Sequence, residues 1–127
     1  MNQKEKKSVK GEWQEITDPD GKQKKIFEAS KEIYHKLFSS EHQEDWFHFR
    51  KYILDTQQKL KNNSKTDPKD HYYVAIVGTE IRGMAFFTTY LRKRLAFISY
   101  FGVLEPYKNK LLAGKGILKL MEVNREG

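Results

Sequence analysis

Residues 72–121 read YYVAIVGTEIRGMAFFTTYLRKRLAFISYFGVLEPYKNKLLAGKGILKLM. The runs at 72–77, 81–90 and 96–103 are rich in β-branched and aromatic residues and are separated by short turns, which predicts three consecutive strands. A basic segment with two glycines follows, and apolar residues then recur at helical spacing. A strand that enters a helix through such a loop offers a phosphate group the unpaired N–H groups and the positive dipole end of the helix. This region therefore predicts a binding site for a phosphorylated cofactor.

Details inside the three strand runs refine this prediction. Gly78 and Thr79 form the expected hairpin turn, and Gly83 indicates a bulge or a close approach of two backbones. The third run is almost wholly apolar, which is typical of a central strand covered on both faces. The following helix is expected to begin at about Leu112. Its predicted buried face consists of Leu112, Ile117, Leu120, Met121 and Val123.

Two helices are predicted before the strands. Residues 26–38 carry apolar side chains with a period of about 3.6, which predicts the first helix. Ser39 and Ser40, with Gln43 and Glu44 downstream, resemble a capping box for the second helix. The buried stripe of that helix is predicted to be Trp46, Phe49, Ile53 and Leu60.

The N-terminal residues 1–25 are polar and rich in lysine. One short edge strand is expected within residues 9–17, and the rest of this segment is expected to be solvated. Residues 26–127 are expected to form a single domain, because a chain of 127 residues with 38% hydrophobic content suffices for one core.

The composition limits the cellular location and the classes of partner that we expect for this chain. No apolar run reaches the roughly 20 residues that cross a bilayer, and the N-terminus lacks a secretory apolar segment, so a cytoplasmic protein without a membrane partner is expected. The chain has no cysteine, which excludes disulfides and thiolate nucleophiles. The net charge of +7 favours anionic partners. The four histidines, His35, His42, His48 and His71, lack the spacing of a metal site, and no metal is expected.

Residues 26–127 resemble the GNAT superfamily of N-acetyltransferases. The segment VAIVGTEIRGMAFFTTY, residues 74–90, is similar to the second and third strands of that family. The segment ISYFGVLEPYKNKLLAGKGILKLM, residues 98–121, looks like its acetyl-CoA motif. The core of that motif is Gln or Arg, then two residues, Gly, one residue, and Gly or Ala. One alignment places Lys108, Leu111 and Ala113 on these three defined positions. A shift along the chain places Ala113, Gly116 and Leu118 there instead, and the first alignment is preferred because it needs no insertion.

The resemblance implies an α+β fold with layered helices and a mixed, mainly antiparallel sheet, which is incomplete at its C-terminal end. Family members continue with three further strands and a helix, so the chain is expected to be the N-terminal portion of such a domain. The implied activity is transfer of an acetyl group from acetyl-CoA, as cosubstrate, to an amine on a small molecule, a protein or an RNA. The resemblance also allows a homodimer.

The same resemblance assigns roles to individual residues. Catalytic roles are expected for Tyr100 and Glu105, although ordered water can replace a base in this family. Phe47 and Tyr52 are expected to border the acceptor cleft. The residues implied in cofactor binding are Phe101, Gly102, Val103, Lys108, Asn109, Lys110, Leu111, Leu112, Ala113, Gly114, Lys115 and Gly116.

Two other functions stay open at this point. The positive charge and the basic turn at residues 92–94 are compatible with a nucleic-acid-binding module. The chain could also be an inactive fragment that folds with a partner chain. Cofactor titration separates the first of these from a transferase.

Overall fold

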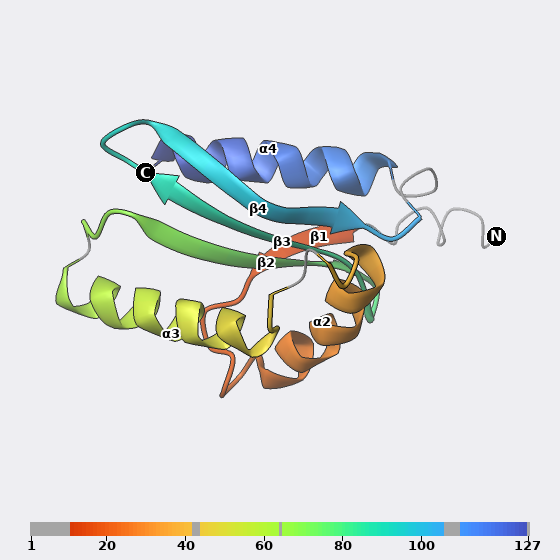
Figure 1. The fold of residues 1–127 in the computed structure, drawn as a ribbon. Coiled ribbons are helices and arrows are strands. Elements are labelled where there is room, and N and C mark those ends of the chain that lie inside the picture. Colours follow the sequence, from red (N-terminus) through yellow and green to blue (C-terminus); the bar gives the residue numbers. More distant parts are fainter. Residues whose placement is uncertain (1–10, 42–43, 64, 106–109, 127) are drawn as a thin grey trace.

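The structure is a computed structural model that describes residues 11–41, 44–63, 65–105 and 110–126. An antiparallel sheet lies between helices on both of its faces (Figure 1), and the strand order is β1-β2-β3-β4. The elements are β1 (Gly11–Glu15), α2 (Lys24–Leu37), α3 (Phe47–Asn62), β2 (Lys69–Val77), β3 (Glu80–Tyr90), β4 (Leu95–Val103) and α4 (Lys110–Glu126). The described part of the chain is therefore mixed α and β, as predicted, with three helices and four antiparallel strands.

Helices α2 and α3 cover one face of the sheet and enclose an aromatic core. Residues of α2 that are three, four or seven positions apart face the same side, so Phe27, Ser30 and Tyr34 are all buried. Phe49 and Ile53 of α3 meet them from the neighbouring helix. The sheet contributes the side chains of alternate strand residues, namely Tyr72, Val74, Met84 and Phe86.

Helix α4 covers the opposite face, as Figure 1 shows. The other set of alternate strand residues points toward it and forms a second apolar layer. This layer consists of Trp13, Tyr73, Ala75, Phe87, Phe101 and Val103, packed against Leu112, Leu120 and Val123 of α4.

Strand β1 lies within the interval where a short strand is predicted, and it pairs with β2. Ile16 follows it into the core and is only 1% exposed. The Gln23 carboxamide oxygen then accepts the N–H groups of Thr17 at 2.7 Å and Asp18 at 2.9 Å, which links this connection to the start of α2. Residues 11–25 thus belong to the folded unit and are not a solvated segment before it, because β1 extends the sheet and Ile16 fills the core.

The predicted start of the second helix is wrong. Helix α3 begins at Phe47, and no side-chain hydrogen bond caps it from the preceding residue. The Asp45 carboxylate instead accepts the Phe47 N–H at 3.1 Å. Ser, Thr, Asp and Asn can all cap a helix, so Ser39 and Ser40 do not by themselves determine where the helix begins. The buried stripe contains Phe49 and Ile53 as predicted.

The hairpin formed by β2 and β3 agrees with its sequence signals. Gly78 has φ of 65°, the left-handed conformation that the turn requires. The register of the two strands shifts next to Gly83. A Cβ at Gly83 would lie 2.7 Å from the carbonyl oxygen of Gly102, so this glycine also permits a close backbone approach. Both expectations for Gly83 are confirmed.

Strand β4 does not occupy the central position that its apolar sequence predicts. Within the described residues it is one of the two edge strands and pairs with β3 alone. Its side chains Leu95, Phe97 and Ile98 are 45%, 63% and 50% exposed. The prediction failed because a run of apolar residues does not distinguish a covered strand from an edge strand whose apolar side chains face solvent.

The predicted buried face of α4 is only partly correct. Leu112 and Leu120 pack against the sheet, but Ile117 and Met121 are 53% and 59% exposed. The residue that faces the sheet between Leu112 and Leu120 is Gly116, at the i, i+4, i+8 spacing of one helix face. A glycine adds no apolar side chain to the sequence pattern. The pattern therefore includes Ile117 and Met121 in the buried face and omits Gly116.

The aromatic core contains a chain of buried hydrogen bonds centred on Tyr72, which is 1% exposed. The Trp46 indole N–H lies 3.4 Å from the Tyr72 hydroxyl, and that hydroxyl lies 2.6 Å from the Ser30 hydroxyl. Ser30 donates to the Phe27 carbonyl oxygen at 2.5 Å, so Tyr72 donates to Ser30 and accepts from Trp46. Burial raises the pKa of Tyr72 to about 12.

Alkaline pH is therefore expected to destabilise the fold through Tyr72. The raised pKa means that the stabilisation is complete below about pH 10, the value for an unfolded tyrosine, and is lost as pH rises toward the folded value. The loss attributable to this residue is about 3 kcal/mol. Urea denaturation at several pH values measures it in the native chain and in Tyr72→Phe. The stability difference between the two should shrink as pH rises, and a constant difference would contradict the assignment.

Candidate functional site

The end of β4 and the beginning of α4 are held together by contacts from three strands. Val103, the last residue of β4, packs with Ala75 of β2 and Leu112 of α4. The Phe101 ring stacks on Trp13 of β1, with ring centroids 5.4 Å apart. The Trp13 indole N–H donates to the Leu112 carbonyl oxygen at 2.7 Å. The first turns of α4 are thereby fixed beside the end of β4.

The N-terminal end of α4 is electropositive. Within the described residues the helix begins at Lys110, so the N–H groups of residues 110–113 have no acceptor inside this part of the helix. The first turn contains no acidic residue that could neutralise the helix dipole. Lys115 lies in the second turn, where its ammonium donates to the Gly11 carbonyl oxygen at 3.2 Å. An anion would meet N–H groups without an acceptor inside the helix and the positive end of the helix dipole here.

The predicted cofactor-binding residues fall into distinct groups around this junction. Phe101, Gly102 and Val103 form the last part of β4. Leu111 is 84% exposed, whereas Leu112 and Ala113 turn toward Val103. Gly114, Lys115 and Gly116 are the fifth to seventh residues of α4, so their N–H groups belong to the interior of the helix rather than to its open end. Lys108 and Asn109 lie outside the described residues.

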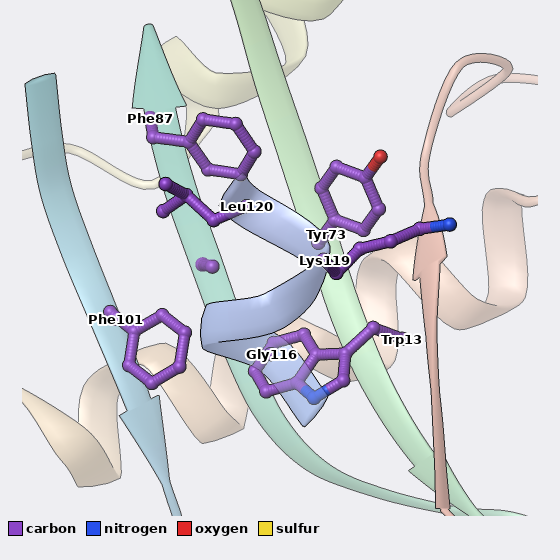
Figure 2. Close-up of a pocket in the computed structure, with 8 residues that line it drawn as sticks. Trp13, Tyr73, Phe87, Phe101, Gly116, Lys119 and Leu120 are labelled. Carbon is purple, nitrogen blue, oxygen red and sulfur yellow. The ribbon is translucent and has the colours of Figure 1, made fainter. Parts of the chain in front are cut away.

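Gly116 contacts the sheet and does not face a ligand. A Cβ at this position would lie 2.7 Å from Trp13 ring carbons and 2.8 Å from the Phe101 ring. Figure 2 shows Gly116 next to the Trp13 ring, and Tyr73, Phe87 and Leu120 line the same small cavity. The cavity among them measures about 10 Å³, which is room for about one water molecule. This interface is a packed core layer and not a binding pocket.

A bulge in β4 lies next to the junction. Phe86 of β3 pairs with Tyr100, but the next residue, Phe87, pairs with Ile98, so Ser99 is an extra residue in β4. Phe97 then pairs with Thr88, which faces the same side of the sheet as Phe86. Phe97 and Tyr100 consequently lie on one face, although regular alternation would place them on opposite faces.

An open groove of about 380 Å³ lies along this part of β4. It is lined by Phe38, Glu44, Phe97, Ile98, Ser99 and Tyr100. Tyr100, predicted as catalytic, thus lies in the groove. Its hydroxyl accepts the Glu44 backbone N–H at 3.2 Å.

Glu44 is a groove residue that the sequence patterns did not identify. Its backbone N–H also donates to the Tyr34 hydroxyl at 2.7 Å, and its carbonyl oxygen accepts from Tyr34 at 2.8 Å. Its carboxylate accepts the Tyr52 hydroxyl at 2.9 Å. Tyr34 and Glu44 are separated by 10 residues and Tyr100 and Glu44 by 56, so no local spacing could connect them.

The Tyr34 and Tyr52 hydroxyls that contact Glu44 remain protonated over a wide pH range. Burial raises the pKa of Tyr34, and its hydrogen bond with Tyr100 adds to the effect. The hydrogen bond to the Glu44 carboxylate raises the pKa of Tyr52. Both tyrosines are therefore dependable donors to Glu44. Tyr52 contacts the groove residue Glu44, but neither Tyr52 nor Phe47 is among the described residues that line the groove. Phe47 is 59% exposed, and the Lys31 ammonium lies 5.0 Å from its ring centroid.

Glu105, the other residue with an expected catalytic role, follows the end of β4. It is exposed and has φ of 47°. The preceding residue, Leu104, donates its N–H to the Arg82 carbonyl oxygen at 2.7 Å, which continues the β3–β4 pairing up to Glu105. Glu105 is not among the residues that line the groove at Tyr100.

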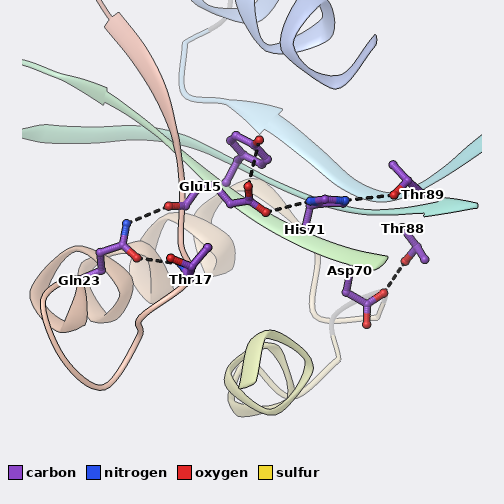
Figure 3. A network of polar contacts seen from close by, with 8 residues as sticks. Glu15, Thr17, Gln23, Asp70, His71, Thr88 and Thr89 are labelled. Carbon is purple, nitrogen blue, oxygen red and sulfur yellow. Dashed lines mark hydrogen bonds and ion pairs between the residues drawn. The ribbon is translucent and has the colours of Figure 1, made fainter. Parts of the chain in front are cut away.

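A second polar cluster links β1, β2 and β3 (Figure 3). The His71 ring contacts the Glu15 carboxylate at 2.8 Å through Nδ1 and the Thr89 hydroxyl at 3.1 Å through Nε2. This order of carboxylate, imidazole and hydroxyl is that of a nucleophilic triad. Thr89 is however only 1% exposed, so its hydroxyl is buried between the strands and is not presented to solvent. We interpret the cluster as a clamp that joins three strands.

The described residues contain no group of histidine and acidic side chains that could hold a metal ion. His42 lies outside those residues. Across the described ranges, no helix has the length and apolar character needed to span a bilayer. Comparison of the chain with protein-family models, with curated proteins and with solved structures finds no match.

Proposed function

We propose that the chain forms the acetyl-CoA-binding part of a GNAT-like N-acetyltransferase domain. The observation that carries this proposal is the junction of β4 and α4. A strand with a bulge and an open outer edge runs toward an electropositive helix end, and the two are locked together by Trp13 and Val103. An extended thioester ligand needs both features, a strand edge for its amide-containing arm and donors for its pyrophosphate.

The position of the helix start supports the first alignment of the cofactor motif. The pyrophosphate would meet the N–H groups of residues 110–113, which lie in the first turn of the described part of α4. The second alignment would use Gly116, which is packed beneath Trp13 and Phe101. In the proposed complex, Tyr100 and Ser99 lie near the thioester, because the bulge is in the part of β4 that the pantetheine arm would follow.

Calorimetric titration with acetyl-CoA tests the proposal, and Gly114→Asp is the informative variant. Among the described residues, no other element of the fold lies within 4 Å of a Cβ at Gly114, and an acidic residue near a helix N-terminus is favourable, so the fold should persist. The added carboxylate should repel the pyrophosphate and raise the dissociation constant about tenfold. Gly114→Asn, which has the same shape without the charge, should bind almost normally.

Two results would overturn the proposal. Equal affinities of Gly114→Asp and Gly114→Asn would exclude this helix end as the phosphate site. Absence of heat at millimolar acetyl-CoA, together with salt-sensitive binding to RNA, would favour the nucleic-acid alternative. The exposed turn of Arg92, Lys93 and Arg94 would then be the first place to map contacts.

A further inference from the structure

The groove beside β4 has one charged side chain among the residues that line it, and that side chain is acidic. The chain as a whole carries a net charge of +7, so a carboxylate at this place contrasts with the rest of the molecule. The Glu44 side chain is 31% exposed, which leaves it accessible from the groove. The His48 Nδ1 lies 3.6 Å from Oε2 of this carboxylate.

Glu44 is held in place before any ligand arrives. Tyr34 and Tyr100 bind its backbone, and Tyr52 binds its carboxylate, so three hydroxyls from α2, β4 and α3 fix its position. The Tyr52 ring stacks on Phe86 with centroids 5.4 Å apart, which anchors that donor to the sheet. A preorganised acceptor binds a charged group at a smaller entropic cost than a freely moving side chain.

Aromatic rings form the remaining wall of the groove. The Phe38 and Tyr100 rings meet edge to face with centroids 4.9 Å apart. Phe97 joins them on the same face because of the bulge at Ser99, and it remains 63% exposed. The faces of aromatic rings attract cations, and their bodies take up apolar stems.

We propose that this groove binds an organic ammonium ion, with Glu44 as its counter-ion and Phe38, Phe97 and Tyr100 as its aromatic wall. The volume of about 380 Å³ suits a small molecule rather than a folded partner. Only the identification of this ammonium as the acceptor amine rests on the proposed function. If the chain is a transferase, its substrates are small cationic amines with an apolar stem.

An amide-resolved NMR titration with phenethylammonium chloride tests the groove without acetyl-CoA. Phenethyl alcohol is the matched neutral ligand. The ammonium is expected to shift the amides of Glu44, Ser99 and Tyr100, and to bind about fivefold more tightly than the alcohol. Equal affinity for the two ligands, or shifts located elsewhere, would overturn the proposal.

Glu44→Gln is the first variant, because the amide oxygen can still accept from Tyr52 while the charge is lost. Its affinity for the ammonium should fall about fivefold, and its affinity for the alcohol should stay unchanged. Glu41→Gln removes the same charge from the exposed connection between α2 and α3 and serves as the control. Phe97→Ser tests the wall independently, because this exposed ring can be removed without opening the core. An undiminished affinity in both Glu44→Gln and Phe97→Ser would contradict the proposal.

The outcome is separable from that of the proposed function. Binding of the ammonium without any binding of acetyl-CoA would support the groove and refute the transferase. Binding of acetyl-CoA without any binding of the ammonium would support the acetyl-CoA site and refute the proposed occupant of the groove. Amide shifts of Phe97 and Ile98 that depend on protein concentration alone would show a second copy pairing with β4, and would overturn the small-molecule occupant.

Discussion

Gly116→Leu is expected to lower the free energy of unfolding by about 3 kcal/mol or to detach α4 from the sheet. The reason is the absence of space, since the Cβ alone would lie 2.7 Å from Trp13 and 2.8 Å from Phe101. Trp13 cannot yield easily, because its indole N–H is bound to the Leu112 carbonyl oxygen in the same helix. The adjacent cavity of about 10 Å³ is too small for a leucine side chain.

Gly114→Leu is the matched control for this prediction. It makes the same change two residues earlier in the same helix, where no other described element lies within 4 Å of the Cβ. Replacing a glycine inside a helix there should stabilise the protein by about 0.5–1 kcal/mol. Urea denaturation followed by circular dichroism measures both variants. A similar effect of the two substitutions would show that α4 does not pack through Gly116.

Phe49→Ala is expected to be the most destabilising truncation in the aromatic core, at about 3–5 kcal/mol. Phe49 is 0% exposed. Its ring centroid lies 5.1 Å from that of Tyr34, 5.3 Å from Tyr72 and 5.0 Å from Phe86. Removal of the ring leaves a cavity bordered by both helices and by the sheet, and these three elements cannot all move in to fill it.

Phe47→Ala provides the comparison, because Phe47 is 59% exposed in the same turn of α3. Its loss should cost about 1 kcal/mol or less, from the contact with Lys31. Thermal unfolding monitored by calorimetry should separate the two variants clearly. Comparable losses at Phe47 and Phe49 would contradict the described orientation of α3.

The parts of the fold that sequence could predict are those with local signals. The β2–β3 hairpin follows from alternating β-formers around Gly78 and from the bulge signal at Gly83. Helix α2 follows from its apolar period. The order of β4 and α4 was also predictable, because these elements are consecutive in the chain.

Contacts between residues that are far apart in the chain could not be predicted from local sequence signals. The hydrogen bond from Trp13 to Leu112 joins residues 99 positions apart, and nothing near Trp13 indicates its partner. The edge position of β4 depends on which strands pair, and its apolar composition suits either position. Glu44 reads locally as a capping residue, and its place in the groove results from the packing of α2, α3 and β4 together.

The two tryptophans lie on opposite faces of the sheet, and this separation gives each layer its own fluorescent reporter. Trp13 contacts α4, whereas Trp46 stacks on Phe27 in the core beneath α2 and α3. Emission from a Trp46→Phe protein therefore reports on the α4 layer alone, and emission from a Trp13→Phe protein reports on the other. Spectroscopy can thus reveal whether α4 separates from the sheet before the aromatic core unfolds.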